Sequence, residues 1–322
     1  MRTLLLRRLL LRTLLLLLAL ISTTAAASTP LAVFVSIPPQ EDFVERVGGD
    51  LVHVESLVKQ GFSPHSYEPT PGQMTRLAAA DLYLGIGLPV EAAWMKRIRA
   101  VNPDITFLDL SSGLSRRPFD WSPVSARADH RAYQGEAAEK SAAAEEHHHD
   151  ESELDPHLWT SPQMVKKMGV GIAESLGQLA PAHKADFAAN LATFQADLDG
   201  LDRDIRRILA GLKHRRFMIF HPSWGYFADT YGLEQIPIEH EGKEPGPRSL
   251  AELIERAKRD DIRIVFAQPQ FSRKAAEKVA QAIGGRVVLA DNLAPNYFDN
   301  LRHFARSLAE TENPATPNPA TP

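Results

Sequence analysis

Short apolar runs alternate with amphipathic segments along most of this chain. The runs at 31–36 and 105–108 are typical of buried strands, whereas 51–58 alternates apolar and polar residues as a half-buried strand does. Segments with helical spacing separate these runs, and the same alternation returns between 217–220 and 297–308. Strands that alternate with helices indicate parallel βαβ units. We therefore expect an α/β fold of two lobes, each with a mostly parallel sheet flanked by helices.

The longest helical pattern lies in the middle of the chain, at residues 181–212. A helix of about 30 residues covers roughly 45 Å, which is longer than a small domain is wide. We therefore predict a long rigid helix that joins an N-terminal lobe at 28–180 to a C-terminal lobe at 213–312. The apolar residues that recur at spacings of three and four, on one helix face, are Phe187, Leu191, Phe194, Leu198, Leu201, Ile205, Ile208 and Leu212.

The first 27 residues differ from both lobes. Four arginines open the segment, an apolar stretch follows at 14–21, and residues 25–27 offer an A-x-A cleavage site. The apolar stretch is shorter than the about 20 residues that a membrane-spanning helix needs. We interpret residues 1–27 as a cleaved signal peptide, with a retained N-terminal anchor as the alternative.

The sequence contains no cysteine. Disulfides, thiolate metal ligands, a cysteine nucleophile and lipid attachment through a cysteine are therefore excluded. An exported protein without such a tether stays near its cell when an outer membrane encloses it. We therefore expect a periplasmic protein.

The charge balance narrows the class of partner. The whole chain has a formal net charge of −4, and removal of the leader, which carries four arginines and no acid, leaves −8. A mildly acidic surface without a basic stripe disfavours nucleic acid as a partner. It suits a protein that binds cations.

The alternation of strands and helices is lost at about 113–154 and again at 313–322. The first stretch is rich in Ser, Arg, Ala, Glu and His, and we predict that it is a mobile insertion. His147, His148 and His149 lie near its end and form either a weak auxiliary metal site or a solvated loop. We expect the second stretch, which ends in NPATPNPATP, to be a disordered tail.

Three histidines lie in proline-flanked segments, and these carry the candidate chemistry. His65 occurs in SPHSYEPTP, His157 in DPHLWTSP and His221 in FHPSWGYF. A proline restrains the backbone next to each ring. A single loop histidine is more often solvated or hydrogen-bonded than a metal ligand, so the prediction depends on the three together.

An acid completes the candidate site. Asp291 directly follows an apolar strand, as His221 does, and ligands of open α/β sheets bind beyond the carboxyl ends of strands. Three imidazoles and one carboxylate form a tetrahedral set suited to Zn²⁺, whereas Mn²⁺ and Mg²⁺ prefer oxygen-rich sets. Glu239 and Glu241 are the alternatives to Asp291.

Each imidazole also needs a partner for its second ring nitrogen, and Glu68 and Asp155 are candidates. The remaining conspicuous side chains have a structural interpretation. We expect Trp94, Trp159 and Trp224 to be packing anchors.

Several segments together identify a family resemblance. The chain resembles the zinc and manganese (cluster A-I) solute-binding proteins of ABC transporters, in which a rigid helix joins two α/β lobes. The resemblance covers about 33–308. The segments that carry it are VSIPPQEDFVERVGGD, LVKQGFSPHSYEPTP, ADLYLGIGLPVE, DPHLWTSP, FHPSWGYFADTYGL, EGKEPGPRSLAELI and QPQFSRKAAEKVA.

The resemblance implies a metal site and its ligands. The family's ligands map onto His65, His157, His221 and, after the last strand, Asp291. Manganese members tend to have glutamate as the third ligand, so a histidine at this position, His221, indicates a resemblance to the zinc branch. The chain departs from the family at Gln268, where members usually have an acid, and we do not expect this to affect ligation.

The resemblance also implies the biological role. We expect a monomer that captures periplasmic Zn²⁺ without catalysis and delivers it to a membrane permease driven by a cytoplasmic ATPase. A manganese-import protein of the same fold is the first alternative. The second is an exported zinc hydrolase in which the three histidines bind zinc and Glu239 or Glu241 is the general base.

Overall fold

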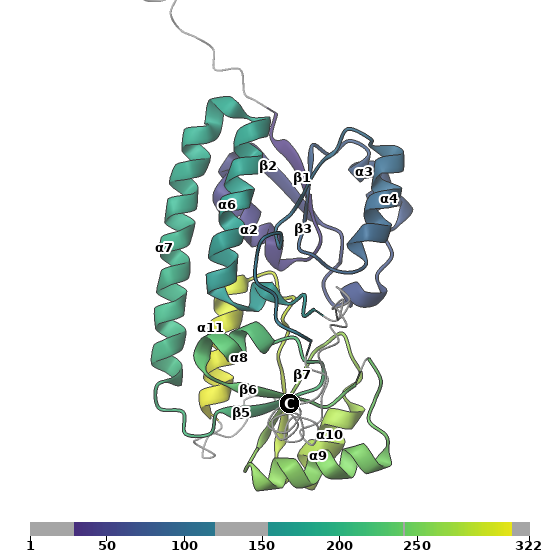
Figure 1. The fold of residues 1–322 in the computed structure, drawn as a ribbon, viewed down its shortest axis with the longest axis vertical. Helices are drawn as coiled ribbons and strands as arrows, with labels where there is room; N and C mark the ends of the chain where they lie inside the picture. Colours follow the sequence, from purple (N-terminus) through teal and green to yellow (C-terminus); the bar gives the residue numbers. More distant parts are fainter. Residues whose placement is uncertain (1–28, 120–153, 241, 311–322) are drawn as a thin grey trace, which may run out of the picture. The chain divides into compact units, whose positions relative to one another are not determined.

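Two four-stranded parallel sheets, one in each lobe, form the centre of this computed structural model (Figure 1). The structure describes residues 29–119, 154–240 and 242–310. The N-terminal sheet has the order β2-β1-β3-β4, and the C-terminal sheet repeats this plan as β6-β5-β7-β8. The strands are β1 (Leu31–Val35), β2 (Val52–Ser56), β3 (Leu82–Gly85), β4 (Thr106–Asp109), β5 (Arg216–Ile219), β6 (Glu234–Pro237), β7 (Ile264–Ala267) and β8 (Arg286–Leu289).

Helices connect these strands and flank the sheets, as the alternating sequence pattern predicts. In the N-terminal lobe they are α2 (Pro39–Gly48), α3 (Pro71–Leu77), α4 (Glu91–Val101) and α6 (Pro162–Leu179). In the C-terminal lobe they are α8 (Gly225–Tyr231), α9 (Pro247–Arg259), α10 (Lys274–Ala282) and α11 (Tyr297–Ala309). Short 3₁₀ turns occur at η1 (Gly49–Leu51), η2 (Pro64–Ser66), η4 (Leu158–Thr160) and η5 (Pro181–His183). The predicted α/β class is confirmed.

The two sheets share a feature that locates binding sites. In each of them the chain moves outward from a central strand, first to one side and then to the other, so the order reverses between β1 and β3 and between β5 and β7. Ligands of open α/β sheets bind at such reversals, beyond the carboxyl ends of the strands. The segments that follow β1 and β5 are therefore the places to look for functional side chains.

The long helix of the middle of the chain is α7 (Lys184–Leu209), with 26 residues. The prediction of one helix over 181–212 was wrong at both ends, because η5 precedes α7 and the helix ends three residues early. At about 1.5 Å per residue it still covers roughly 39 Å. It packs on α6 and α2 of the N-terminal lobe and on α11 of the C-terminal lobe (Figure 1). It therefore joins the lobes, as predicted.

The lobes also share one hydrophobic core. The main cluster of buried side chains runs from the N-terminal sheet through α6 and α7 to one face of the C-terminal sheet. Phe43 of α2 meets Tyr297 of α11 edge-on, with ring centroids 4.8 Å apart, and Trp224 stacks on Phe304 at 3.8 Å. A second, smaller cluster lies beneath α9 and α10. The predicted packing role of the tryptophans agrees with the burial of Trp94, Trp159 and Trp224.

The predicted insertion at 113–154 is anchored at both of its ends. Pro118 and Leu154 form an antiparallel bridge, and the backbone N–H of Arg117 donates to the Tyr226 hydroxyl at 3.0 Å. Residues 113–119 of the predicted insertion thus lie against the rest of the protein. Its central part, with His147, His148 and His149, lies outside the described residues, as do the predicted signal peptide (1–27) and tail (313–322).

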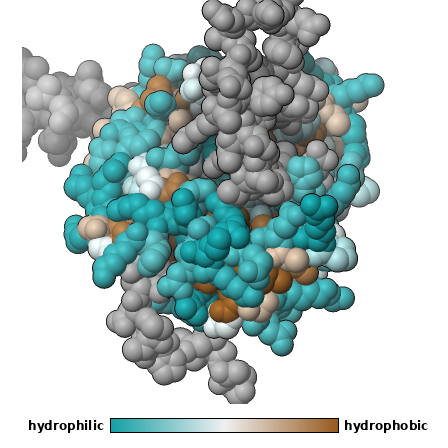
Figure 2. Space-filling view, turned by 60° about the horizontal axis from the view of Figure 1, so that its bottom comes forward, coloured by the Kyte–Doolittle hydropathy of each residue, from teal (hydrophilic) through white to brown (hydrophobic). Residues whose placement is uncertain are grey.

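The visible surface at the lower end of Figure 1 is mostly hydrophilic. Figure 2 turns this end forward and shows apolar residues there as small separate groups among polar ones. Within the described ranges, no helix has the length and apolar character needed to cross a bilayer.

Candidate metal site

Three imidazoles from distant parts of the sequence converge between the lobes. Potential ligand atoms of His65, His157 and His221 all lie within 4.8 Å of one another. Nε2 of His157 lies 3.4 Å from Nε2 of His221. These three form the one group of potential metal ligands among the described residues. The structure therefore brings the predicted histidines together.

His157 is held by Asp155 through two contacts. The backbone N–H of His157 donates to Asp155 Oδ1 at 2.9 Å, and the ring Nδ1 lies 2.8 Å from the same oxygen. Because a carboxylate accepts, Nδ1 carries the proton, and Nε2 is left with a lone pair. Such carboxylate–histidine pairs orient metal-binding imidazoles. The predicted partner role of Asp155 agrees with this geometry, whereas Glu68 forms an ion pair with Arg97 at the surface.

A close approach of helix α8 keeps Asp155 in place. The second carboxylate oxygen of Asp155 lies 3.9 Å from Nη1 of Arg117, and the Asp155 backbone carbonyl accepts from the Tyr226 hydroxyl of α8 at 2.7 Å. Gly225 opens α8 beside this pair, and a Cβ on it would lie 1.6 Å from the Arg117 guanidinium. A larger residue at this position would therefore displace the Arg117 guanidinium from its place beside Asp155.

His221 is held by Glu239 in the same way. It follows β5 at the reversal of the C-terminal sheet, and its Nδ1 lies 2.5 Å from Glu239 Oε1. Burial lowers the pKa of His221, against the opposing effect of the Glu239 hydrogen bond. The ring is therefore kept neutral, which is the form that binds a metal. Sequence reasoning treated Glu239 as an alternative ligand or base and missed this role, which depends on β6 lying beside β5.

His65 lies on the 3₁₀ turn η2, whose start is fixed by Ser63. The Ser63 hydroxyl accepts from the backbone N–H of His65 at 3.3 Å. His65 has more solvent-accessible surface than His157 or His221, but its ring lies inside the group, with its centroid 5.2 Å from that of His221. Burial of the ring, and after it the neighbouring His221 and His157, lower the pKa of His65 to about 3.

The loop that carries His65 is held from behind by Gln73. This buried side chain accepts from the Tyr67 hydroxyl and donates to the Leu57 carbonyl at 2.6 Å. It also forms a capping box with Thr70 at the start of α3. The turn on which His65 lies is therefore connected to a well-capped helix.

Aromatic rings enclose the three imidazoles. Phe271 stacks on His221 with centroids 4.8 Å apart, and Trp159 lies 5.1 Å from His157. Phe119, from the described start of the insertion, lies 5.6 Å from His157. Apolar surroundings strengthen electrostatic interactions and exclude water. Sequence reasoning did not single out Phe119 or Phe271, because neither has a metal-binding group.

Asp291 lies close to this group but not in it. Its Oδ1 accepts from Gln270 Nε2 at 2.7 Å and from the Leu293 backbone N–H at 3.0 Å. The strand order explains the separation, because β7 lies between β5 and β8, and two strand spacings amount to about 10 Å. Asn292 and Leu293 nevertheless line the same cavity as the histidines. The assignment of Asp291 as fourth ligand stays a prediction.

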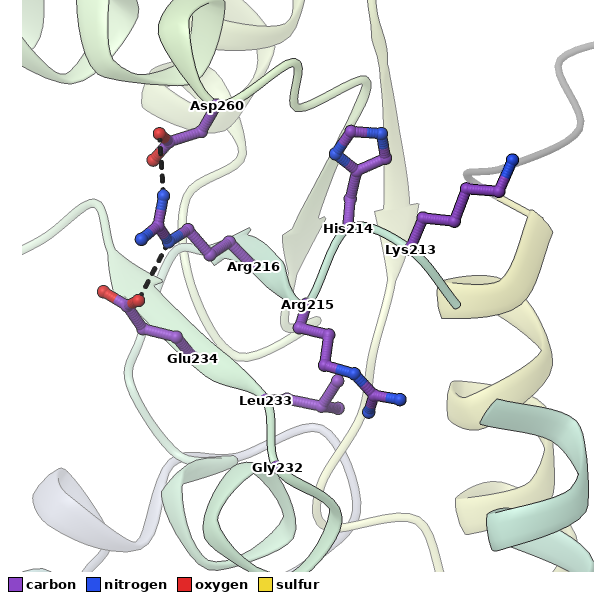
Figure 3. Close-up of a pocket in the computed structure, with 8 residues that line it drawn as sticks. All are labelled: Lys213, His214, Arg215, Arg216, Gly232, Leu233, Glu234 and Asp260. Carbon is purple, nitrogen blue, oxygen red and sulfur yellow. Dashed lines mark hydrogen bonds and ion pairs between the residues drawn. The ribbon is translucent and has the colours of Figure 1, made fainter. Parts of the chain in front are cut away.

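A second, larger pocket lies at the amino-terminal ends of β5 and β6, away from the histidines. It has a volume of about 410 Å³ and is lined by the basic segment 213–216 that leads into β5 (Figure 3). Arg216 lies between Glu234 and Asp260, with contacts of 3.0 and 3.1 Å, so its charge is balanced locally. Its lining of basic and acidic side chains distinguishes this pocket from the cavity that His65, His157 and His221 line.

Comparison with known proteins finds zinc-uptake proteins that are similar to this chain along most of its length. The chain is 28% identical over 265 residues to the "High-affinity zinc uptake system protein ZnuA" of Bacillus subtilis (strain 168), covering 82% of this chain and 78% of that protein. A crystal structure of ZnuA matches with a TM-score of 0.76 and 37% identity, covering 87% of this chain and 98% of the other. A zinc-bound deletion mutant of ZnuA matches equally well, with a TM-score of 0.76 over 89% of this chain and 100% of the other.

The family assignment agrees with the fold and with the donor set. The family model described as "Zinc-uptake complex component A periplasmic" matches residues 33–311. The two parallel sheets, the long helix and the three converging imidazoles lie within that range. The chain is a member of this family of zinc-uptake components.

Proposed function

We propose that this protein captures one Zn²⁺ ion between its lobes with His65, His157 and His221 and delivers it to an ABC permease for import. The observation that carries the proposal is the convergence of the three imidazoles, with potential ligand atoms within 4.8 Å of one another. Two of the three rings have Nδ1 beside a buried carboxylate, which leaves Nε2 for the metal. The family and the solved structure of ZnuA support the proposal.

Zinc is the metal that this donor set favours. Imidazole nitrogen suits Zn²⁺, whereas Mn²⁺ prefers sites rich in carboxylate and carbonyl oxygen. Asp291 is the proposed fourth ligand, because Asn292 and Leu293, which follow it directly, line the same cavity as the histidines. Three nitrogens and one oxygen give the tetrahedral set that Zn²⁺ adopts in closed sites. Manganese import is the less favoured alternative.

The site has the features of a binding site rather than of a hydrolase. Glu239, the general base that a hydrolase would need, is engaged with Nδ1 of His221 and is fully buried. A fourth protein ligand would also remove the open position that a catalytic zinc requires. The other candidate base, Glu241, lies outside the described residues. We therefore propose a transport function without catalysis.

The partners and the location follow from the proposed role. The relative from Bacillus subtilis is named as a protein of a zinc uptake system, which supports a membrane permease and a cytoplasmic ATPase as partners. The family description supports a periplasmic location for a chain exported by a signal peptide. We propose that the protein acts as a monomer and without nucleic acid.

Metal titration tests the proposal directly. The protein, stripped with a chelator, is titrated with Zn²⁺ and with Mn²⁺ in competition with a chromophoric chelator, and its metal content is measured by native mass spectrometry. We expect one Zn²⁺ per chain, and a loss of affinity of roughly 100-fold or more in His157→Ala and His221→Ala. His183→Ala, which changes a histidine at the start of α7, is the control. Tighter binding of Mn²⁺ would overturn the choice of metal, and wild-type affinity in both site variants would overturn the site.

A further inference from the structure

Two buried glutamines hold the loop that carries His221, one from each strand beside β5. Gln268 follows β7 and contacts His221 itself: its Oε1 accepts from the His221 N–H at 3.1 Å, and its Nε2 donates to the His221 carbonyl at 2.6 Å. The same Nε2 also donates to the Ser223 hydroxyl at 3.0 Å. The Gln268 side chain is fully buried. One amide therefore satisfies both backbone groups of a proposed metal ligand.

Gln235 holds the other end of the same loop. It lies on β6, its Oε1 accepts from the Trp224 N–H at 3.1 Å, and its Nε2 donates to the Pro222 carbonyl at 3.3 Å. It is buried like Gln268, but its hydrogen bonds go to the residues that follow His221. The two glutamines are thus chemically matched and differ in whether they contact the ligand residue.

The hydrogen bonds of Gln268 require a side chain that both accepts and donates. A carboxylate in this place would accept from the His221 N–H but would have no proton to donate to the His221 carbonyl. An apolar side chain would leave both backbone groups of His221 without this partner in the protein interior, which is costly. The expectation from sequence, that the glutamine at this position does not affect ligation, disregarded this contact.

Backbone and ring of His221 are therefore fixed by different residues. Gln268 fixes the position of the backbone, and Glu239 fixes the rotation of the ring through Nδ1. Together they place Nε2 of His221 at 3.4 Å from Nε2 of His157. Zn–N bonds have lengths of about 2.0–2.1 Å, so a nitrogen displaced by a few tenths of an ångström no longer binds the ion well.

We propose that Gln268 is a positioning residue for the bound metal, whose amide sets the zinc affinity and the coordination geometry by fixing the backbone of His221. This inference rests on the proposed function, because it assumes that His221 is a ligand. A purely structural role is the alternative, since buried amides also satisfy loops that bind nothing. The matched pair Gln268 and Gln235 separates the two.

The experiment compares Gln268→Met with Gln235→Met. Methionine keeps the length and approximate volume of glutamine and removes its hydrogen bonds. For each variant we would measure the zinc affinity by chelator competition, the melting temperature of the apoprotein, and the visible absorption spectrum with Co²⁺ as a probe of geometry. We expect both variants to melt at lower temperature, because both lose buried hydrogen bonds.

Only Gln268→Met is expected to change the metal site. Its zinc affinity should fall about tenfold or more, the equivalent of one buried hydrogen bond, and its Co²⁺ spectrum should lose the intensity of a tetrahedral site. Gln235→Met should keep both within about threefold. Gln268→Glu, which restores the acceptor for the His221 N–H, should regain part of the affinity.

The outcomes that contradict the inference are distinct. Wild-type affinity in a folded Gln268→Met, an equal loss in Gln235→Met, or no recovery in Gln268→Glu would each show that Gln268 has only a structural role. Should Gln268→Met fail to fold, Gln268→Glu against Gln235→Glu gives the same test, with weaker binding expected in the first alone. A wild-type protein that binds no zinc would overturn the proposed function and this inference together.

Discussion

Glu239 approaches Nδ1 of His221 to 2.5 Å, and this contact leaves Nε2 as the ring nitrogen that faces His157. The same relationship recurs between Asp155 and His157. In each pair a buried carboxylate fixes the tautomer and the ring rotation of an imidazole before any ion arrives. These two imidazoles are therefore already oriented in the folded protein.

The first prediction concerns this pair. Glu239→Gln keeps the shape of the side chain but removes its charge, so the hydrogen bond to His221 weakens and the ring becomes less basic. We expect the zinc affinity to fall by roughly 10–100-fold, the usual effect of losing such a partner. Isothermal titration with a competing chelator measures the change. Glu252→Gln, on the exposed face of α9, should bind as the wild type does, and an equal effect of both variants would contradict the assignment.

The second prediction concerns the fourth ligand. If Asp291 completes a tetrahedral site, Asp291→Ala should lower the zinc affinity by about tenfold or more and allow water into the coordination sphere. Asp299→Ala, an exposed acid of α11, is the matched control. A hydrolase with three histidine ligands would bind zinc nearly as before, so unchanged affinity in Asp291→Ala would favour that alternative.

The third prediction concerns pH. The pKa of His65 is lowered to about 3 in the folded apoprotein, from 6.5 in a solvated chain. Between these values the unfolded chain binds a proton that the folded one does not, so stability falls as the pH drops below 6.5 and is unaffected above it. The lowered pKa of His221 acts in the same direction.

Thermal melting of the apoprotein between pH 8 and pH 4 measures this dependence. We expect the melting temperature to fall on the acid side, and to fall less in His65→Gln, which has no titratable group at this position. At pH 8 the titration of His65 should contribute nothing to the difference in melting temperature between the two proteins, because this histidine is then neutral in both the folded and the unfolded chain. Parallel curves for the two proteins over the whole range would show that His65 is not held neutral by its surroundings.

The fourth prediction concerns the shared core. Phe43 is fully buried and meets Tyr297 of the other lobe at 4.8 Å. Phe43→Ala should therefore destabilise the protein by about 3–5 kcal/mol, as other large-to-small changes in cores do. Because one core serves both lobes, calorimetry should show a single transition that shifts as a whole. Phe62→Ala, at a side chain that is 57% exposed, should change little. Two separate transitions would show that the lobes unfold independently.

The fifth prediction concerns the insertion. Deletion of residues 130–150, which removes His147, His148 and His149, should leave the tight site unchanged, since the described ends of the insertion keep Phe119 near the imidazoles. Zinc titration should then show the same high affinity and the loss of any weak second site. A large loss of affinity would mean that the insertion contributes a ligand.

Local patterns predicted many of the helices and strands, and they singled out three histidines that the structure brings together. The apolar run at 31–36 predicted a buried strand, and β1 occupies Leu31–Val35, because a strand in the middle of a parallel sheet is covered on both faces. The pairing of Asp155 with His157 was also within reach, since the two residues are neighbours in a tight turn. The family predicted from the motifs is confirmed.

Features that depend on strand order were not predictable in this way. Glu239 reaches His221 because β6 lies beside β5, and Asp291 is kept apart because β7 intervenes. No periodicity in the sequence records which strands are neighbours. The same holds for Gln268, which contacts His221 across 47 positions of the chain. Pairs of this kind follow from tertiary structure, and a single sequence does not reveal them.

The continuous core has a consequence for the speed at which zinc enters and leaves. Rotation of one lobe against the other would expose the buried contact between Phe43 and Tyr297, so wide opening is disfavoured. We expect the ion to enter and leave instead through motions of the turns that carry His65 and His157. Loop motions occur in nanoseconds to microseconds, whereas domain rotations take microseconds to milliseconds. The dissociation rate should therefore reflect the strength of the metal–ligand bonds and not the frequency of a hinge.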